Sequence, residues 1–385
     1  MKPLFQRLMK EATRLTRNGN LHAATEAIQR ALHIGTPPTD RPQPTPMPTA
    51  TPTPAAAAAA AAREADVIEA EVRVIDKTPA EADAEFAYVE PADPAEAGQA
   101  APEQWRDGSF AHGGRTLAYK LYLPPRAPGA IAAPMPLVLM LHGCTQNPAD
   151  FAVGTRMNDL ARAQGFAVLY PAQTQHANAQ GCWNWFKPQH QQRGRGEPAL
   201  LAALTQFVMA SEAIDPARVY VAGLSAGGAM ADILGRCYPD LFAAVGVHSG
   251  LPTGAATDVM SALGAMRNGA AHRPPAAGPM PPVIVFHGDA DSTVHPRNGA
   301  AVVSAARGAD ASGGEISQGR SAAGRAFTRS DYPAGAGRNA VEHWLLHGAG
   351  HAWSGGSSQG SYTEPNGVDA SAEMLRFFLA HPRGR

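Results

Sequence analysis

Residues 218–230 read RVYVAGLSAGGAM, a stretch that predicts a strand, a tight turn and a helix in direct succession. Four residues of mostly apolar character precede Gly223 and form the strand, and an Ala- and Met-rich helical segment follows the turn. Ser225 lies at the apex, where the flanking glycines let strand and helix pass close to it. We expect its hydroxyl to point outward and the Ala226 N–H to lie at the helix N-terminus, where it can donate to a developing oxyanion.

The composition is that of a globular protein. Hydrophobic residues make up 44% of the 385 residues and charged residues 17%, which suits a chain with a substantial core. The 32 basic and 33 acidic residues give a net charge of −1, so no excess of positive charge marks a nucleic-acid binder. No run of about 18 apolar residues occurs, and a membrane span is not expected.

The chain divides into three regions. Residues 1–34 hold two helical patterns separated by Asn-Gly-Asn, a helical hairpin too small to bury much alone; we expect it to dock on its own domain, on a partner or on a hydrophobic granule. Residues 35–102 are Pro/Thr repeats, polyalanine and an acidic stretch, which predict a disordered linker. Residues 103–385 form the main domain.

The N-terminal sequence does not resemble a secretory signal. MKPLFQRLMKEATRLTRNGN carries charges every few residues and lacks an uninterrupted apolar core. A cytoplasmic location is therefore the expectation, and secretion is the alternative.

The main domain begins with a β-hairpin over residues 110–123, after which strands and helices alternate. Alternation of this kind predicts an α/β fold with a mostly parallel sheet covered by helices on both faces. In such sheets the functional site lies at the carboxyl ends of the strands, which is where Ser225 lies. The expected strands are 137–141, 167–170, 219–222, 243–247, 283–286, 326–332 and 341–346, and the expected helices are 148–164, 197–211, the segment after Ser225, 299–309 and 368–380.

A serine hydroxyl is a poor nucleophile without a base, and the base needs an acidic partner to fix its tautomer. Two later strands end in suitable residues: HGDADSTV follows the first from residue 287, and HGAGHAW follows the second from residue 347. The chain order Ser225, Asp291, His351 is the one expected of an α/β-hydrolase. These three residues are the predicted catalytic triad.

Each of the two loops offers a second candidate. Asp289 is the alternative acid, and His347 is the alternative base. We favour His351 because His347 still lies on the strand, and Asp291 because an apolar residue just beyond it can pack the loop.

A second oxyanion donor is expected after an earlier strand. The strand 137–141 leads into His-Gly-Cys-Thr-Gln, where Gly143 lets the backbone turn its N–H groups inward. The N–H of Cys144 or of Thr145 is the candidate donor beside that of Ala226. The alternative is that His-Gly here is only a turn.

An aromatic loop, GCWNWF at residues 181–186, lies on the same edge of the sheet. We expect Trp183 and Trp185, with Trp353 just past the predicted base, to be exposed and to form a wall for an apolar or polymeric acyl substrate. The alternative is a local cluster that pins a long loop.

Three cysteines are too few for a disulfide scaffold and lack the spacing of a zinc site. Cys144 and Cys182 both flank the predicted pocket, so either a disulfide or two free thiols fits their positions. Cys237, at the end of the helix after Ser225, is expected to be buried.

Six segments in order resemble the poly(3-hydroxybutyrate) depolymerase family of esterases, which are relatives of the acetyl-xylan and feruloyl esterases. The similarity covers about residues 105–381. The segments are LHGCTQNPADF at 141–151, GCWNWF at 181–186, GLSAGGAM at 223–230, YPDLFAAVGVHSG at 238–250, HGDADSTV at 287–294 and GAGHAWSGG at 348–356.

The resemblance implies an α/β-hydrolase fold with the same triad and an oxyanion hole near Cys144 and Ala226. It implies hydrolysis of carboxylic esters through an acyl-enzyme, without metal or cofactor. The expected substrates are short-chain hydroxyalkanoate esters, polymeric esters or their oligomers. A carbohydrate-ester esterase is the alternative within enzymes, and a granule- or partner-binding protein on a hydrolase fold is the alternative of another class.

Overall fold

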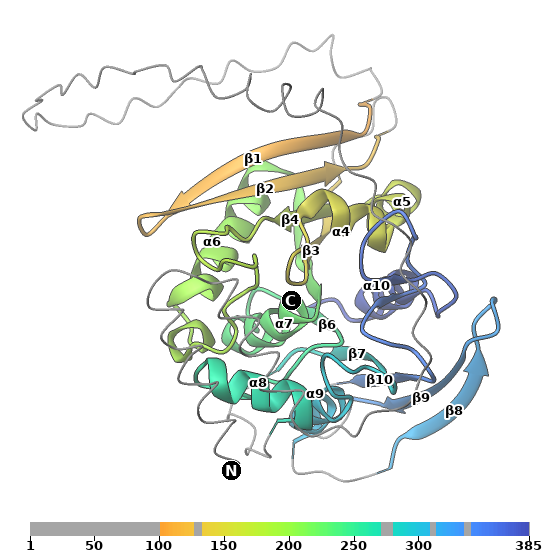
Figure 1. The fold of residues 1–385 in the computed structure, drawn as a ribbon. Helices are drawn as coiled ribbons and strands as arrows, with labels where there is room; N and C mark the ends of the chain where they lie inside the picture. Colours follow the sequence, from red (N-terminus) through yellow and green to blue (C-terminus); the bar gives the residue numbers. More distant parts are fainter. Residues whose placement is uncertain (1–100, 127–132, 271–279, 309–312, 335–339, 385) are drawn as a thin grey trace, which may run out of the picture. The chain divides into compact units, whose positions relative to one another are not determined.

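The computed structural model describes residues 101–126, 133–270, 280–308, 313–334 and 340–384 (Figure 1). The predicted hairpin at 1–34 lies outside these residues, as does the predicted linker at 35–102 except for its last two residues. Over the described ranges, none of the helices has the length and apolar character needed to cross a membrane.

One sheet of ten strands organises the described residues (Figure 1). Its order is β1-β2-β4-β3-β5-β6-β7-β10-β9-β8. The strands are β1 Gln104–His112, β2 Arg115–Leu123, β3 Met135–Leu141, β4 Ala167–Pro171, β5 Ile214–Leu224, β6 Ala244–His248, β7 Val283–Gly288, β8 Glu315–Arg320, β9 Ala326–Tyr332 and β10 Val341–Leu346. The run from β4 to β10 is parallel, whereas β2 and β9 join it antiparallel. The predicted α/β fold with a mostly parallel sheet is confirmed.

Helices cover both faces of this sheet. Helices α6, α7, α8 and α9 contribute to one hydrophobic core, and α4, α5 and α10 contribute to the other (Figure 1). The helices are α4 Pro148–Thr155, α5 Met157–Gln164, α6 Gly196–Ser211, α7 Ala226–Cys237, α8 Val259–Asn268, α9 Arg297–Arg307 and α10 Ala370–Ala380, with a short 3-10 helix η3 at Pro188–Gln191 and two short strands, β11 Trp353–Ser354 and β12 Thr363–Glu364.

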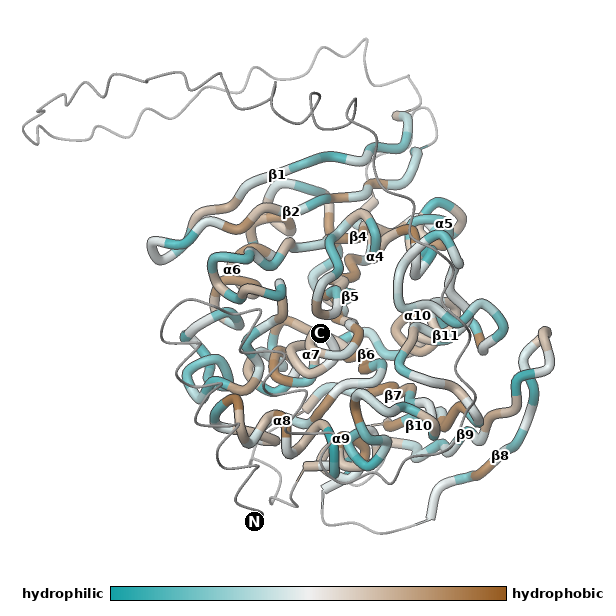
Figure 2. The backbone as a smooth tube through the Cα atoms, in the orientation of Figure 1, coloured by the Kyte–Doolittle hydropathy of each residue, from teal (hydrophilic) through white to brown (hydrophobic). Residues whose placement is uncertain are grey.

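The two cores follow from the two-residue period of the strands. Leu137 and Leu139 of β3 enter the first core, and Val138 and Met140 between them enter the second. Because both faces are covered, every residue of β3 is buried, and the strand reads as a continuous apolar run. In Figure 2 the inner strands are mostly hydrophobic, whereas β1 and β8 at the two edges include hydrophilic stretches.

The predicted single helix 148–164 is wrong. Arg156 adopts a left-handed conformation (φ 56°) and separates α4 from α5. Its N–H still donates to the carbonyl of Ala152, so the first helix ends on a satisfied turn. Gly154 lies two residues before this break, and it is the only glycine or proline close to it in the sequence.

Candidate active site

Ser225 lies between β5 and α7 in a sparsely populated backbone conformation, with φ 59° and ψ −119°. Non-glycine residues with positive φ are uncommon, and such strain persists where the surroundings fix it. Here the N–H of Ser225 donates to the carbonyl of His248 (2.9 Å), and the N–H of Ala229 donates to the Ser225 carbonyl (2.9 Å). Both contacts hold the serine at the carboxyl end of β5.

The glycines on either side of Ser225 permit close backbone contact. A Cβ at Gly227 would lie 2.0 Å from the carbonyl oxygen of Leu141, and a Cβ at Gly223 would lie 2.4 Å from the carbonyl carbon of Gly227. Real Cβ atoms do not approach backbone so closely, so both positions require glycine. The first turn of α7 therefore packs directly on the end of β3.

Asp291 and His351 meet beyond the ends of β7 and β10. The distance from Asp291 Oδ2 to His351 Nδ1 is 2.7 Å. The backbone N–H groups of Thr293 and Val294 donate to Asp291 Oδ1 at 2.9 and 2.8 Å. Burial raises the pKa of Asp291, but hydrogen bonds from His287 and His351 outweigh it and hold that pKa well below its usual value. Asp291 is therefore a buried carboxylate at neutral pH.

The two alternative residues pair with each other. His347 Nδ1 lies 2.8 Å from Asp289 Oδ2, and His347 Nε2 lies 2.8 Å from the hydroxyl of Thr328. Both nitrogens of His347 are thus occupied. Among the described residues, by contrast, Nε2 of His351 has no hydrogen-bond partner. Of the two histidines, only His351 therefore has a nitrogen available to take a proton.

His248, the last residue of β6, joins the two halves of the site. Its carbonyl accepts from Ser225, and its Nε2 accepts from the N–H of Ser354 (3.0 Å), three residues after His351. Burial, with the nearby His287 and His351, lowers the pKa of His248 to about 3. The ring stays neutral and keeps the lone pair that accepts from Ser354.

The loop after β3 lies directly beside Ser225, since a Cβ at Gly143 would be 3.6 Å from the Ser225 Cβ. The N–H of Thr145 donates to the carbonyl of Gln180 (2.8 Å), so the prediction of Thr145 as an oxyanion donor is wrong. Gln180, which accepts this hydrogen bond, lies in a different loop, and the sequence around Thr145 does not predict that contact. Within the described ranges, the N–H groups of Cys144 and Ala226 have no hydrogen-bond partner.

A disulfide joins Cys144 to Cys182, with their Cα atoms 4.3 Å apart. It connects the loop after β3 to the aromatic loop. The indole of Trp183 adds a second link by donating to the carbonyl of His142 (3.1 Å). Cys237 is half-buried rather than buried, and burial raises the pKa of its thiol to about 11.

The predicted exposed wall of tryptophans is wrong. Trp183, Trp185 and Trp353 are only 1%, 5% and 1% exposed. Trp353 stacks on His248 and donates to the hydroxyl of Ser371 (3.0 Å). These large apolar rings are buried in the two cores, where they fix the loops around the site.

The sequence interpretation missed the loop of residues 354–364. Tyr362 in this loop is 48% exposed, and its hydroxyl lies 3.2 Å from that of Thr145. The polar, Gly- and Ser-rich sequence directly after His351 was the available signal, but no spacing rule connects it with the loop after β3.

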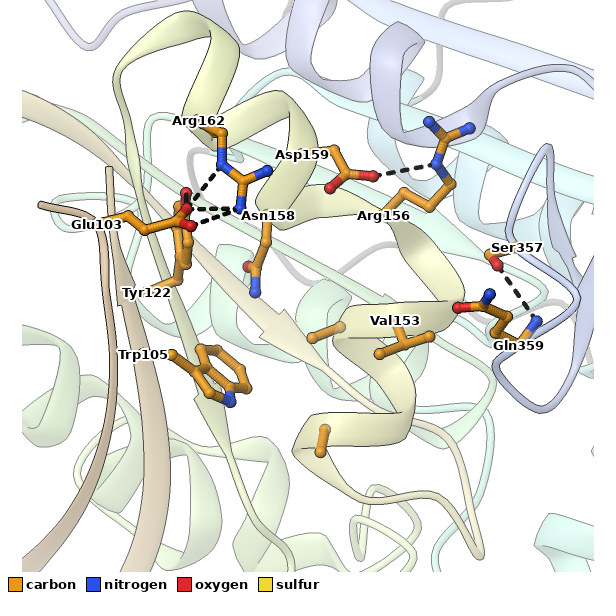
Figure 3. Close-up of a pocket in the computed structure, with 12 residues that line it drawn as sticks. Glu103, Trp105, Tyr122, Val153, Arg156, Asn158, Asp159, Arg162, Ser357 and Gln359 are labelled. Atoms are coloured by element: carbon orange, nitrogen blue, oxygen red, sulfur yellow. Dashed lines mark hydrogen bonds and ion pairs between the residues drawn. The ribbon is translucent and has the colours of Figure 1, made fainter. Parts of the chain in front are cut away.

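A separate hollow of about 680 Å³ lies at the β1–β2 hairpin, α4 and α5 (Figure 3). Trp105 and Val153 contribute its apolar surface, from β1 and α4 respectively. Its charged side chains pair with one another, as Glu103 with Arg162. None of the three predicted triad residues lines it, so this hollow is distinct from the site at Ser225.

Known proteins are similar to parts of this chain. The family model described as esterase PHB depolymerase matches residues 117–307. Poly(3-hydroxyalkanoate) depolymerase C of Paucimonas lemoignei is 37% identical over 183 residues, which are 44% of this chain and 44% of that protein. Feruloyl esterase B of Neurospora crassa is 29% identical over 188 residues, which are 44% of this chain and 63% of that protein. The chain thus spans less than two thirds of either relative.

The acetyl xylan esterase from Aspergillus awamori has a similar fold. Its TM-score is 0.52 at 20% sequence identity, and the match covers 64% of this chain and 94% of that one. This likeness supports the α/β-hydrolase fold. The family match and the sequence relatives confirm the resemblance drawn from the sequence motifs. Residues 117–307 of the chain are thus similar to esterases of the PHB depolymerase family.

Proposed function

We propose that this chain is a serine esterase that hydrolyses carboxylic esters with Ser225, His351 and Asp291. The observation that carries the proposal is the 2.7 Å hydrogen bond between Asp291 and His351 at the same sheet edge as the Ser225 turn. Nucleophile, base and acid in this chain order are the constellation of α/β-hydrolases. The family match supports the same reaction class.

The reaction begins when His351 Nε2 takes the proton of the Ser225 hydroxyl as its oxygen attacks the ester carbonyl carbon. The carbonyl oxygen becomes an oxyanion, which the N–H groups of Cys144 and Ala226 stabilise. When the C–O bond to the alcohol breaks, His351 returns the proton to the leaving oxygen. Water then releases the acyl group from Ser225 by the same steps.

Asp291 fixes the tautomer of the base. By accepting from Nδ1 of His351, it leaves the lone pair on Nε2, where it can take the proton of the nucleophile. Its lowered pKa keeps the carboxylate ionised, so it also stabilises the imidazolium that forms during each proton transfer. Hydrogen bonds from backbone N–H groups hold its other oxygen in place.

The proposed substrates are short-chain 3-hydroxyalkanoate esters or their oligomers. The depolymerase relative of Paucimonas lemoignei and the family match support this choice. A carbohydrate-linked ester is the second candidate, and the feruloyl esterase relative of Neurospora crassa supports it. Side-by-side assays on hydroxybutyrate oligomers, acetylated xylan and feruloyl esters separate the two candidates.

The test of the reaction itself is hydrolysis of p-nitrophenyl butyrate by the full chain. The rate constant kcat should fall at least about a thousandfold in Ser225→Ala, because no other group replaces the nucleophile. Ser304→Ala, on the exposed side of α9, is the matched control and should keep the rate of the unaltered chain. A fluorophosphonate should label the unaltered chain but not Ser225→Ala. Retained turnover or labelling in that variant would contradict the proposal.

A further inference from the structure

Hydrogen bonds clamp the loop that follows His351 to the loop that follows β3 and to α4. Gln146 Nε2 donates to the carbonyl of Ser361 (3.0 Å), and the N–H of Ser361 donates to Asp150 (2.8 Å). The N–H of Ser357 donates to the carbonyl of Gly154 (2.8 Å). These bonds join two segments more than 200 residues apart, on either side of the candidate site.

Thr145 and Tyr362 face each other where the two loops meet. Both have positive φ, 64° and 51°, and neither is glycine. A left-handed conformation is unfavourable for a non-glycine residue, so the contacts of the two loops must hold both residues in place. The N–H of Thr145 donates to Gln180, and the Tyr362 carbonyl accepts from Trp353 (2.7 Å).

The direction of the hydrogen bond between the two side chains follows from proton counting. The Thr145 hydroxyl has one proton and donates it to the Cys144 carbonyl (2.6 Å). The 3.2 Å contact therefore has the Tyr362 hydroxyl as its donor. The phenolic oxygen keeps lone pairs free to accept another hydrogen bond.

This hydroxyl pair is exposed and close to the reacting atoms. Tyr362 is 48% exposed, and Thr145 is exposed as well. Thr145 directly follows Cys144, and in the proposed mechanism the N–H of Cys144 faces the oxyanion. The Cα of Thr145 is at most about 7.6 Å from the Cα of Gly143, which lies beside Ser225.

We propose that Tyr362, with Thr145, binds a substrate hydroxyl group close to the scissile ester and so determines specificity. The proposal rests on the esterase function proposed above. The substrate O–H donates to a free lone pair of the Tyr362 oxygen, while the phenolic proton stays hydrogen-bonded to Thr145 and orients that oxygen; a substrate without this hydroxyl cannot make the bond. Such a hydroxyl comes either from a 3-hydroxyacyl group, on the acyl side, or from a sugar ring, on the alcohol side.

The test compares ester pairs that differ only in the hydroxyl. For the acyl side these are ethyl 3-hydroxybutyrate and ethyl butyrate; for the alcohol side they are a monoacetylated methyl xyloside and its dideoxy analogue, which lacks the remaining ring hydroxyl groups. The readout is the ratio of kcat/KM within each pair, followed by acid release. In Tyr362→Phe this ratio should fall about tenfold for one pair, since a hydrogen bond of about 1–1.5 kcal/mol is lost.

Two further variants isolate the hydroxyl groups. Thr145→Ser keeps the hydroxyl and should keep the ratio, whereas Thr145→Ala should lower it. Tyr119→Phe, which removes a phenolic hydroxyl from β2, is the matched control and should leave both ratios as in the unaltered chain.

The result also identifies the source of the hydroxyl. A fall confined to the first pair assigns a 3-hydroxyacyl ester, and a fall confined to the second assigns a sugar ester. If Tyr362→Phe lowers kcat/KM by the same factor for both esters of each pair, or does not lower it, the proposed role of Tyr362 is overturned. Failure of the esterase function is separate, because the unaltered chain would then show no Ser225-dependent turnover on any of the four esters.

Discussion

At the scale of single residues, two Asp–His pairs of nearly equal geometry lie at the ends of β7 and β10. The carboxylate to Nδ1 distances are 2.7 Å for Asp291–His351 and 2.8 Å for Asp289–His347. Surroundings distinguish them. The side chain of Asp291 is fully buried, whereas those of Asp289 and His347 are each 38% exposed. Solvent screens the exposed pair, so its interaction is weaker.

This difference leads to a paired prediction. Asp291→Asn should lower kcat on p-nitrophenyl butyrate by about 10⁴-fold, because an amide there favours the wrong tautomer of His351. Asp289→Asn should lower it less than about tenfold, since the exposed pair only ties the loop. Equal losses in the two variants, or a larger loss in Asp289→Asn, would refute the assignment of Asp291.

Residue-scale inference from the sequence located a side chain where a residue's place on the chain fixes its place in the fold, whereas the catalytic roles stay predictions. Ser225, Asp291 and His351 each follow a parallel strand, and parallel strands end at one edge. It failed for Thr145, whose N–H is taken by another loop, and for Tyr362, which reaches the site through side-chain hydrogen bonds. Such contacts depend on tertiary packing, which local patterns do not encode.

At the scale of elements, the contact between α7 and β3 has no spare space. Gly227→Ala should destabilise the protein by about 3 kcal/mol or more, because the new Cβ would lie 2.0 Å from a carbonyl oxygen. Gly264→Ala, within α8, meets open space and should instead stabilise by about 0.5–1 kcal/mol. Urea midpoints of the two variants check both signs. A Gly227→Ala protein as stable as the unaltered chain would show that the junction relaxes.

The strands and helices themselves were largely predictable, and the exceptions have physical causes. β3 and β7 are buried on both faces and read as apolar runs. β8, which was not predicted, is an edge strand with mostly exposed residues and no apolar alternation. The break between α4 and α5 arises because Arg156 adopts a left-handed conformation, which its residue type does not predict.

At the scale of the whole molecule, the sheet separates two hydrophobic cores, and the class of this architecture was predictable from alternation alone. The order of the strands in the sheet was not predictable, because the alternation of strands and helices does not determine which strand pairs with which. The predicted hairpin and nearly all of the linker precede the described residues, and they remain predictions.

Acid should weaken this fold through His248. Its pKa of about 3 in the folded state lies below the value of about 6.5 for an unfolded histidine, so the unfolded chain binds more protons between these limits. Stability is therefore complete above pH 6.5 and falls as the pH drops. Between pH 6.5 and 5 the loss from this residue should be about 1.6 kcal/mol. His248→Gln, measured by urea unfolding at both pH values, should show a smaller loss than the unaltered chain; an equal loss would refute the role of His248.

The clamp between Gln146 and Ser361 has a consequence for exchanging parts between relatives. The segment matched by the family model ends at residue 307, so it contains the proposed nucleophile, acid and oxyanion donors but neither His351 nor Ser361. A chimaera that transplants only residues 117–307 would combine one half of the site with a base and a clamping loop from another parent. A compatible unit for grafting must extend at least through β12, because a segment that ends at residue 307 lacks the Ser361 side of the clamp.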